Sequence, residues 1–316
     1  MDGGEKILKN MRYRSERHIY LFVASAARYV VLISFGYMLL YPVLFFISSA
    51  LKSTADYYDP TVQWVPKSLS FDNFVNALKV LDYGKSVLST FVNEVVAALI
   101  QVVSCMVAAY GLSRFNLKCK KLLTAVMIFT ILIPFPMILV PSYVNFQMVD
   151  FLGILGGLGK LFNVELRPSL LNTPLVFWLP SLFAVGLKGS LFIYIYSQFF
   201  KGLPRELEEA AWIDGAGPLR TFWSIIIPSS GTAIITVLLF SVIWHWNDYY
   251  LAQIYLSENY PLGVKITNIY QLFAKVEGLN SLNQGGIIMA ACFLMILPML
   301  VFYLFSGGNT RILGSC

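Results

Sequence analysis

Six largely apolar stretches, each of about 20 residues or more, constrain this chain more than any other feature of its sequence. An α-helix needs about 20 such residues to cross a bilayer. The stretches lie at residues 29–51, 86–112, 122–146, 175–199, 232–256 and 286–305. Only 13% of the 316 residues are charged, against roughly 25% in a soluble domain. The sequence therefore predicts an all-α polytopic membrane protein with six transmembrane helices.

The distribution of basic residues predicts the orientation of these helices. If the N-terminus is inside, thirteen of the 23 Lys and Arg residues fall in short inner segments and eight in longer outer loops. Basic residues are retained on the cytoplasmic side, so both termini are predicted to lie inside. The basic start resembles a signal peptide, but its apolar run is too long for one, and we interpret it as a retained span.

This topology divides the chain into four segments, which are a basic cytoplasmic N-terminus (1–28), a first helix with its outer loop (29–85), a transmembrane core (86–306) and a short cytoplasmic tail (307–316). The outer loops are long enough to be partly structured. Prolines cluster in the third span at Pro134, Pro136 and Pro141, and Pro180 lies in the fourth. Proline removes a backbone donor, so these two helices are predicted to be kinked or broken.

The long inner loop at 200–228 has the pattern of two short helices joined by a turn. Pro204 suits the first turn of a helix, and the acidic residues that follow it favour the positive helix end. Asp214 and Gly215 mark a turn, Pro218 starts a second apolar helix, and Pro228 ends it. An exposed apolar surface rimmed by charge indicates a docking surface. The alternative is a helical hairpin that lies flat on the membrane.

This loop resembles the EAA loop of permease subunits in ABC-type importers. Glu209, Ala210, Ala211, Gly215, Ile225 and Pro228 match that pattern at its spacing, and Ile227 replaces the usual Leu. Asp214 belongs to a longer form similar to the carbohydrate-uptake branch, the maltose-type second permease. The resemblance extends over residues 86–306.

The resemblance implies a permease subunit that forms half of the translocation path for a sugar or oligosaccharide in the bacterial plasma membrane. It implies a heterodimer with a second permease, two ATPase subunits docked on the loops, and an extracellular solute-binding protein. Gly215 should then bend the loop, Glu209 should pair with a basic residue of an ATPase, and Ala210 and Ala211 should fill its cleft.

The sequence itself holds no enzyme motif. The stretch at 153–161 approaches a phosphate-binding loop, but its glycine spacing is wrong and it lies on the predicted outer face. The four cysteines and two histidines lack metal-ligand spacing, so no metal or cofactor is expected, and His245 is expected to pack at the outer boundary. The net charge of +6 is modest and does not indicate a nucleic-acid partner.

Polar residues inside spans are costly and therefore suggest function. They either line the substrate path, with aromatic rings for stacking on sugars, or link helices by hydrogen bonds. The cation of Lys188 could pair with the carboxylate of an acidic sugar, or it could pair with Glu94. The candidates are Asn93, Glu94, Gln101, Lys188, Tyr194, Trp244, Asn247 and Asp248.

Three other functions compete with a sugar importer subunit. An ABC importer for a non-sugar solute would share the loop. A stand-alone secondary transporter or channel would need no ATPase-docking loop, and a structural scaffold would need no kinked helices or buried polar groups. Recovery of an ATPase and a second permease from membranes would favour the importer.

Overall fold

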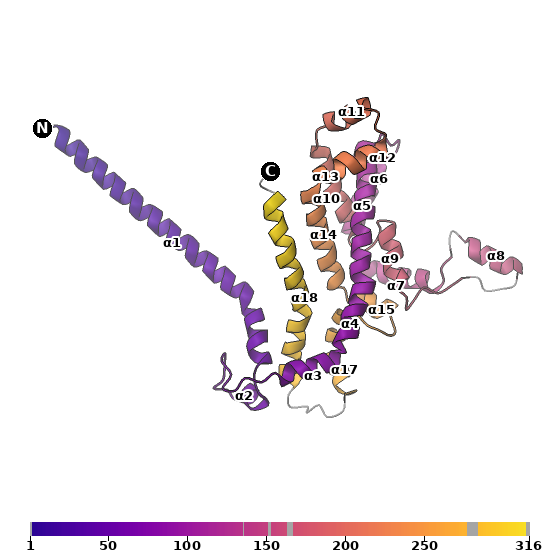
Figure 1. Ribbon diagram of the computed structural model, residues 1–316, viewed down its shortest axis with the longest axis horizontal. Helices are drawn as coiled ribbons and strands as arrows, with labels where there is room; N and C mark the ends of the chain where they lie inside the picture. Colours follow the sequence, from indigo (N-terminus) through magenta and orange to yellow (C-terminus); the bar gives the residue numbers. More distant parts are fainter. Residues whose placement is uncertain (1, 135, 151–152, 163–166, 277–283, 314–316) are drawn as a thin grey trace. The chain divides into compact units, whose positions relative to one another are not determined.

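The computed structural model describes residues 2–134, 136–150, 153–162, 167–276 and 284–313, and this part of the chain is almost entirely helical (Figure 1). It contains no β-strand, only an isolated bridge between Lys52 and Leu69, so the all-α class is confirmed. The elements are α1 (Asp2–Ala50), α2 (Thr54–Tyr58), α3 (Asp72–Leu81), α4 (Tyr83–Thr90), the π-helix η1 (Phe91–Val95), α5 (Val96–Arg114), α6 (Lys120–Leu132), α7 (Pro136–Gln147), α8 (Ile154–Phe162), α9 (Leu175–Leu182), α10 (Gly189–Gly202), α11 (Glu206–Ile213), α12 (Pro218–Thr221), the π-helix η2 (Phe222–Ile226), α13 (Ile227–Ser229), α14 (Gly231–Trp246), α15 (Tyr250–Tyr255), α16 (Leu262–Thr267), α17 (Ile269–Phe273) and α18 (Gln284–Leu313).

The chain forms two compact units. The first comprises residues 1–74 and 282–293, and the second comprises residues 75–281 and 294–316. In the first unit, the segment after α1 is folded rather than extended. Lys52 Nζ donates to the carbonyls of Val62 and Gln63 at 2.9 Å each, and Asn73 Nδ2 donates to Ala50 O at 3.0 Å. The expectation of partly structured outer loops is met here.

An exposed ion pair fixes the tip of this segment. Lys67 Nζ lies 2.6 Å from Asp59 Oδ2, and Thr61 donates to the same carboxylate. The hydrogen bond from Lys67, followed by those from Thr61, holds the pKa of Asp59 below its usual value. The carboxylate is therefore ionised at neutral pH and keeps the tip closed.

Among the described residues, three helices are long and apolar enough to cross a membrane. They are Tyr20–Ala50, Tyr83–Arg114 and Gln284–Leu304. Two bent pairs raise the number to five if each pair counts as one span: Lys120–Leu132 with Pro136–Gln147, bent by 105°, and Pro218–Ser229 with Gly231–Trp246, bent by 79°. Pro134 and Pro136 thus fall where the helix breaks, as the sequence predicts, whereas Pro141 lies inside α7. The number of six spans remains a prediction.

The predicted span at 175–199 is broken, as its proline predicts, because α9 ends at Leu182 and α10 begins at Gly189. The break lies after Pro180, which is inside α9. Between them, Ala184 and Lys188 have left-handed backbones with φ of 59° and 61°. Carbonyls freed by a broken helix must find donors inside the protein when no water is present. Side chains of α5 meet that need, since Gln101 Nε2 donates to Leu187 O at 2.8 Å and Ser104 donates to the carbonyl of Ser181.

The predicted span at 232–256 is also interrupted. Its helix α14 ends at Trp246, and the short helix α15 begins only at Tyr250. Asn247 caps the end of α14, because its Nδ2 donates to Ile243 O at 2.8 Å. The continuous membrane-crossing part is therefore shorter than the apolar run in the sequence.

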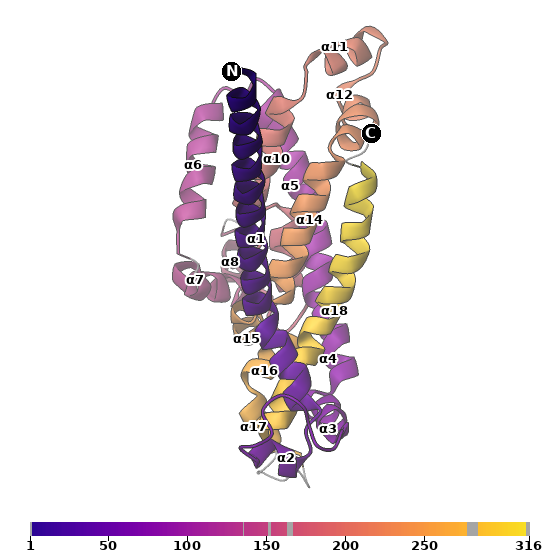
Figure 2. The ribbon, with the colours of Figure 1, turned by 90° about the vertical axis from the view of Figure 1, so that its left-hand side faces the viewer.

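The core of the second unit lies where α5, α10 and α14 run side by side (Figure 2). Phe192, Tyr196 and Phe200 stand four residues apart on one face of α10 and are fully buried. They pack against Ala109 of α5 and Val237 of α14. Small residues on α5 let the neighbouring backbone approach closely, which is the usual basis of helix packing in membranes.

We predict that Gly189→Ala lowers the melting temperature of the purified protein by several degrees. A Cβ at this position would collide with the carbonyl oxygen of Ala184 and lie 3.2 Å from Gln101 Nε2, and overpacking of a filled core costs about 1–3 kcal/mol. Gly84→Ala is the matched control, because nothing lies within 4 Å of a Cβ placed there. Equal melting temperatures for the two variants, measured by thermal unfolding in detergent, would contradict this packing.

Candidate functional site

The loop between α10 and α14 folds as the predicted pair of short helices. The first helix, α11, has Glu206, Glu208 and Glu209 in its first turn, where the helix dipole stabilises carboxylates. The second begins with Pro218 at its first position and continues through η2 to Ser229. Figures 1 and 2 both show α11 and α12 at one end of the helices of the second unit.

A Schellman motif ends α11 and produces the bend. The amide of Ala216 donates to Ala211 O at 2.9 Å, and that of Gly215 donates to Trp212 O at 3.0 Å. This motif requires a left-handed residue after the helix, and Gly215 supplies it with φ of 79°. Glycine has no Cβ, so it adopts this backbone readily. The predicted bend at Gly215 is confirmed.

The loop exposes an unusual number of apolar side chains at its surface. Ala211 differs from its neighbour Ala210, because Ala211 is only 8% exposed and packs into its own chain. The expectation that Ala211 fills the cleft of a partner is therefore wrong for this conformation, and Ile225 is only half-exposed. The exposed apolar side chains include Leu207, Ala210, Trp212, Ile213, Leu219, Trp223 and Pro228, and the predicted residues Glu209 and Asp214 are exposed as well.

A buried ion pair joins the loop to the end of α5. Arg114 Nε lies 2.7 Å from Glu208 Oε1, and both side chains are at most 5% exposed. Arg114 also donates from Nη2 to Leu203 O at 2.9 Å, and the hydroxyl of Tyr110 lies 3.5 Å from Glu208 Oε2. Removal of either charge would leave the other buried without a counter-charge, which is strongly unfavourable. The loop is thereby fixed to α5.

Aromatic packing adds a second connection between the loop and the helices. The ring of Tyr110 lies 4.8 Å from that of Phe222 in η2 and 6.1 Å from that of Phe200 in α10. Phe222 and Ile226 are buried in the core of the second unit. The second loop helix is thus part of that core, whereas α11 projects beyond it.

A second polar cluster links η1 and the first half of α5 to α14. His245 Nε2 lies 2.8 Å from Gln101 Oε1, and His245 Nδ1 lies 3.2 Å from Glu94 Oε2. All three side chains are at most 3% exposed. For Glu94 and Gln101 the geometry favours hydrogen bonding between helices over contact with a substrate. His245 is buried and holds this cluster together, and its expected position at the outer boundary stays a prediction.

The structure separates Lys188 from Glu94. Lys188 is exposed at the start of α10, and in the part of the chain that the structure describes it forms no ion pair. Glu94 has His245 as its partner instead. The interpretation that Lys188 pairs with Glu94 is therefore wrong, and its contact with an acidic sugar stays a prediction.

The remaining candidates lie in different surroundings. Asn93 and Asp248 are both 7% exposed, and Asp248 Oδ1 accepts from the amide of Leu251 at 3.4 Å. Asn247 is exposed. Trp244 is half-buried, with its ring 5.6 Å from that of Phe192 and 5.5 Å from that of Phe240. Tyr194 is 38% exposed on α10. The structure therefore does not gather the predicted path residues into one site.

Sequence reasoning missed Glu208, Arg114 and His245 as organising residues. A signal was available for His245, because it is one of two histidines and lies within an apolar span, where an ionisable residue needs a partner. Glu208 differs from Glu209 only by one position, and its inward direction depends on where Arg114 lies.

Apolar helices of spanning length, with a bent and exposed loop held at one end by a buried ion pair, define a polytopic membrane protein. Comparison with known proteins specifies this class. The chain matches, over residues 101–311, the family described as binding-protein-dependent transport system inner membrane component. The match covers about two thirds of the chain, so the chain belongs to this family and is a multi-pass transport component rather than an enzyme.

Curated relatives match over most of their length. The chain is 27% identical over 266 residues to the probable starch degradation products transport system permease protein AmyC of Thermoanaerobacterium thermosulfurigenes, covering 83% of this chain and 85% of the relative. It is 29% identical over 265 residues to the melibiose/raffinose/stachyose import permease protein MelC of Bacillus subtilis, with the same coverage.

A solved structure shares the fold. A chain of a bacterial ABC transporter involved in the import of the acidic polysaccharide alginate superposes with a TM-score of 0.66, over 90% of this chain and 96% of that one, at 21% identity. The fold is therefore that of an ABC transporter permease.

We predict that Glu208→Ala destabilises the protein far more than Glu209→Ala. Loss of Glu208 leaves the Arg114 guanidinium buried without its partner, which typically costs 3–5 kcal/mol. Glu209 is exposed, and such surface changes stay within about 0.5 kcal/mol. Thermal unfolding of the purified variants measures the difference. The double variant Arg114→Met with Glu208→Met should recover part of the loss, and equal melting temperatures for the two alanine variants would refute the anchor.

Proposed function

We propose that this chain is one of two membrane subunits of an ATP-driven importer and forms half of the translocation path for a sugar or oligosaccharide. The observation that carries the proposal is the exposed, bent α11–α12 loop that a buried ion pair fixes to α5. A free hairpin on a membrane would not need such an anchor. Family membership and the saccharides in the relatives' names support the transport of a sugar.

The loop is proposed to receive an ATPase subunit on the cytoplasmic side. Ala210 offers a small side chain that lets another backbone approach, and Glu209 beside it is free to pair with a basic residue. Trp212 and Ile213 supply apolar area, with 50% and 86% of their side chains exposed. Two ATPases would dock in this way, one on this chain and one on a second permease, and an extracellular solute-binding protein would deliver the sugar.

The topology that goes with this function is six spans with both termini inside. Residues 86–306 would form the transmembrane core, preceded by a first helix and outer loop at 29–85 and a basic N-terminus at 1–28, and followed by a tail at 307–316. Exposed candidates such as Lys188, Tyr194 and Asn247 are proposed to face the path in another state of the transport cycle, while Glu94 and Gln101 hold the helices together.

We predict that Ala210→Arg abolishes sugar uptake by the complete importer but leaves the amount of inserted protein unchanged. The new side chain would occupy the docking surface without entering the core, because Ala210 is exposed. Ala274→Arg, at an exposed position outside the loop, is the control and should transport normally. Uptake of labelled sugar into cells and immunoblots of their membranes provide the two readings.

Gly215→Pro tests the bend independently. Proline has a φ near −65° and cannot adopt the left-handed backbone of Gly215, so α11 should point in another direction. The ATPase subunits should then be lost from the complex during affinity purification. Normal uptake and an intact complex in both Ala210→Arg and Gly215→Pro would refute the docking role.

A further inference from the structure

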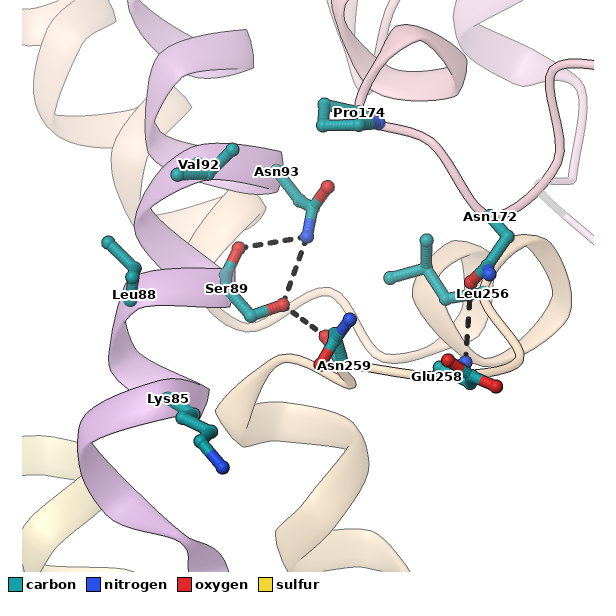
Figure 3. A pocket seen from close by; sticks show the side chains of 10 residues that line it. All are labelled: Lys85, Leu88, Ser89, Val92, Asn93, Asn172, Pro174, Leu256, Glu258 and Asn259. Carbon is teal, nitrogen blue, oxygen red and sulfur yellow. Dashed lines mark hydrogen bonds between the residues drawn. The ribbon is translucent and has the colours of Figure 1, made fainter.

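A pocket of about 300 Å³, whose lining is mostly apolar with a few polar side chains, lies in the second unit beside α4 and η1 (Figure 3). Figure 3 shows that its wall on one side is a single helical face, and that two loop segments close the other side. Its volume is at the low end of the ~300–1,000 Å³ range of ligand pockets. The lining residues are Lys85, Leu88, Ser89, Val92, Asn93, Asn172, Pro174, Leu256, Glu258 and Asn259.

Three asparagines dominate the polar part of this lining, and each leaves hydrogen-bonding capacity free. Asn93 is 7% exposed and donates from Nδ2 to Ser89 O and Ser89 Oγ at 2.9 and 3.0 Å, so its Oδ1 remains as an acceptor. Asn172 Oδ1 accepts from the amides of Ser257 and Glu258 at 3.2 and 3.3 Å, so its Nδ2 remains as a donor. Among the described residues, neither of these atoms has a partner, nor does the side chain of Asn259.

This pattern suits a ligand that is rich in hydroxyl groups. A hydroxyl both donates and accepts, and an amide offers the matching pair of groups. Charge adds little selection, since Lys85 and Glu258 oppose each other in sign and Lys85 lies 3.3 Å from Asp82. Val92, Pro174 and Leu256 supply apolar surface for the carbon face of a sugar ring.

Backbone geometry alone would explain two of the asparagines. Asn172 and Asn259 have φ of 62° and 50°, and asparagine is enriched among residues with this left-handed backbone. It does not explain Asn93, which lies in the π-helix η1 and is not among the left-handed residues, nor the presence of all three asparagines around one pocket. The difference can be tested, because aspartate and glycine also tolerate this backbone.

The pocket lies at the far end of the helix that carries the loop anchor. Asn93 and Arg114 belong to one continuous helical segment, Tyr83–Arg114, and the 21 helical steps from one to the other correspond to about 30 Å at 1.5 Å per residue. This distance is about the thickness of the hydrocarbon core of a bilayer. A ligand in the pocket would therefore lie on the side opposite the docking loop, where an imported solute arrives.

We propose that this pocket binds one neutral sugar ring of the transported saccharide as it enters, through the side-chain amides of Asn93, Asn172 and Asn259. The proposal rests on the proposed function, because it assigns to that function a saccharide contact on the entry side of this subunit.

The test uses the complete importer in nanodiscs without its solute-binding protein. Raffinose and maltotriose are the probes, with glycine as a non-sugar control, and saturation-transfer NMR measures their binding. In Asn172→Asp the oxygen that holds Ser257 and Glu258 is kept, the free donor is replaced by an acceptor oxygen, and one negative charge is added, which the Asn116→Asp control also adds. We expect its Kd for the bound saccharide to rise about tenfold, and that of Asn259→Gly, which keeps the backbone, to rise severalfold.

Asn116→Asp is the matched control, since Asn116 is exposed at the other end of α5 and its Kd should not change. If Asn172→Asp and Asn259→Gly both bind the saccharide with wild-type affinity, the pocket is not a sugar site. The proposed function would still hold in that case if the importer takes up sugar. An importer that takes up neither saccharide but takes up glycine would overturn both. Weakened binding of the sugar-free solute-binding protein in these variants, with saccharide affinity unchanged, would identify a protein contact and also overturn the proposal.

Discussion

The buried pair of Glu208 and Arg114 is the interaction on which the rest of the arrangement depends. Two charges removed from water are costly, and only their close contact and added hydrogen bonds offset that cost. Here the guanidinium contacts the carboxylate at 2.7 Å and also a backbone carbonyl. This contact fixes the position of α11 relative to α5, so the two helices are expected to move together. A short helix of eight residues, marginal by itself in water, thereby becomes a fixed part of a membrane-spanning body.

The helix that carries Arg114 also supplies the hydrogen bonds that lipid cannot. Gln101 reaches the carbonyl of Leu187 in the break between α9 and α10 while it also contacts His245 of α14. Ser241 of α14 donates back to the carbonyl of Ala98. Unpaired backbone groups are not tolerated in a bilayer, so the irregular backbone at 183–188 can exist only beside these side chains. Polar residues that the sequence offered as substrate contacts are thus required by the fold.

Features that depend on neighbouring residues could be predicted from the sequence. Features that depend on contacts between distant residues could not. The bend at Gly215 and the break at Pro134 and Pro136 follow from residues within a few positions of each other. Apolar length also indicated membrane helices, and Pro180 predicted a break in the fourth span. Neither determines the backbone at 183–188, since Gln101, 86 residues before Leu187, holds it. Likewise nothing in the run from Glu206 to Glu209 distinguishes the buried glutamate from the exposed one. The position of Arg114 determines which glutamate is buried, and the packing of α5 against α10 sets that position.

The same contacts determine how a displacement of the loop would travel. α14 meets the preceding loop helix at a bend of 79°, and such a bend would by itself let the two rotate separately. The hydrogen bonds of His245 with Glu94 and Gln101 remove that freedom, because they tie the far half of α14 to α5. Trp178 of α9 is tied to the same helix, through a 2.8 Å bond to the carbonyl of Val92 in η1. We therefore expect a displacement of α11 to move α5, α9 and α14 together, as in rigid-body switching. Such a displacement would shift the whole helix and so move Asn93. No series of side-chain rearrangements along the helix would be needed.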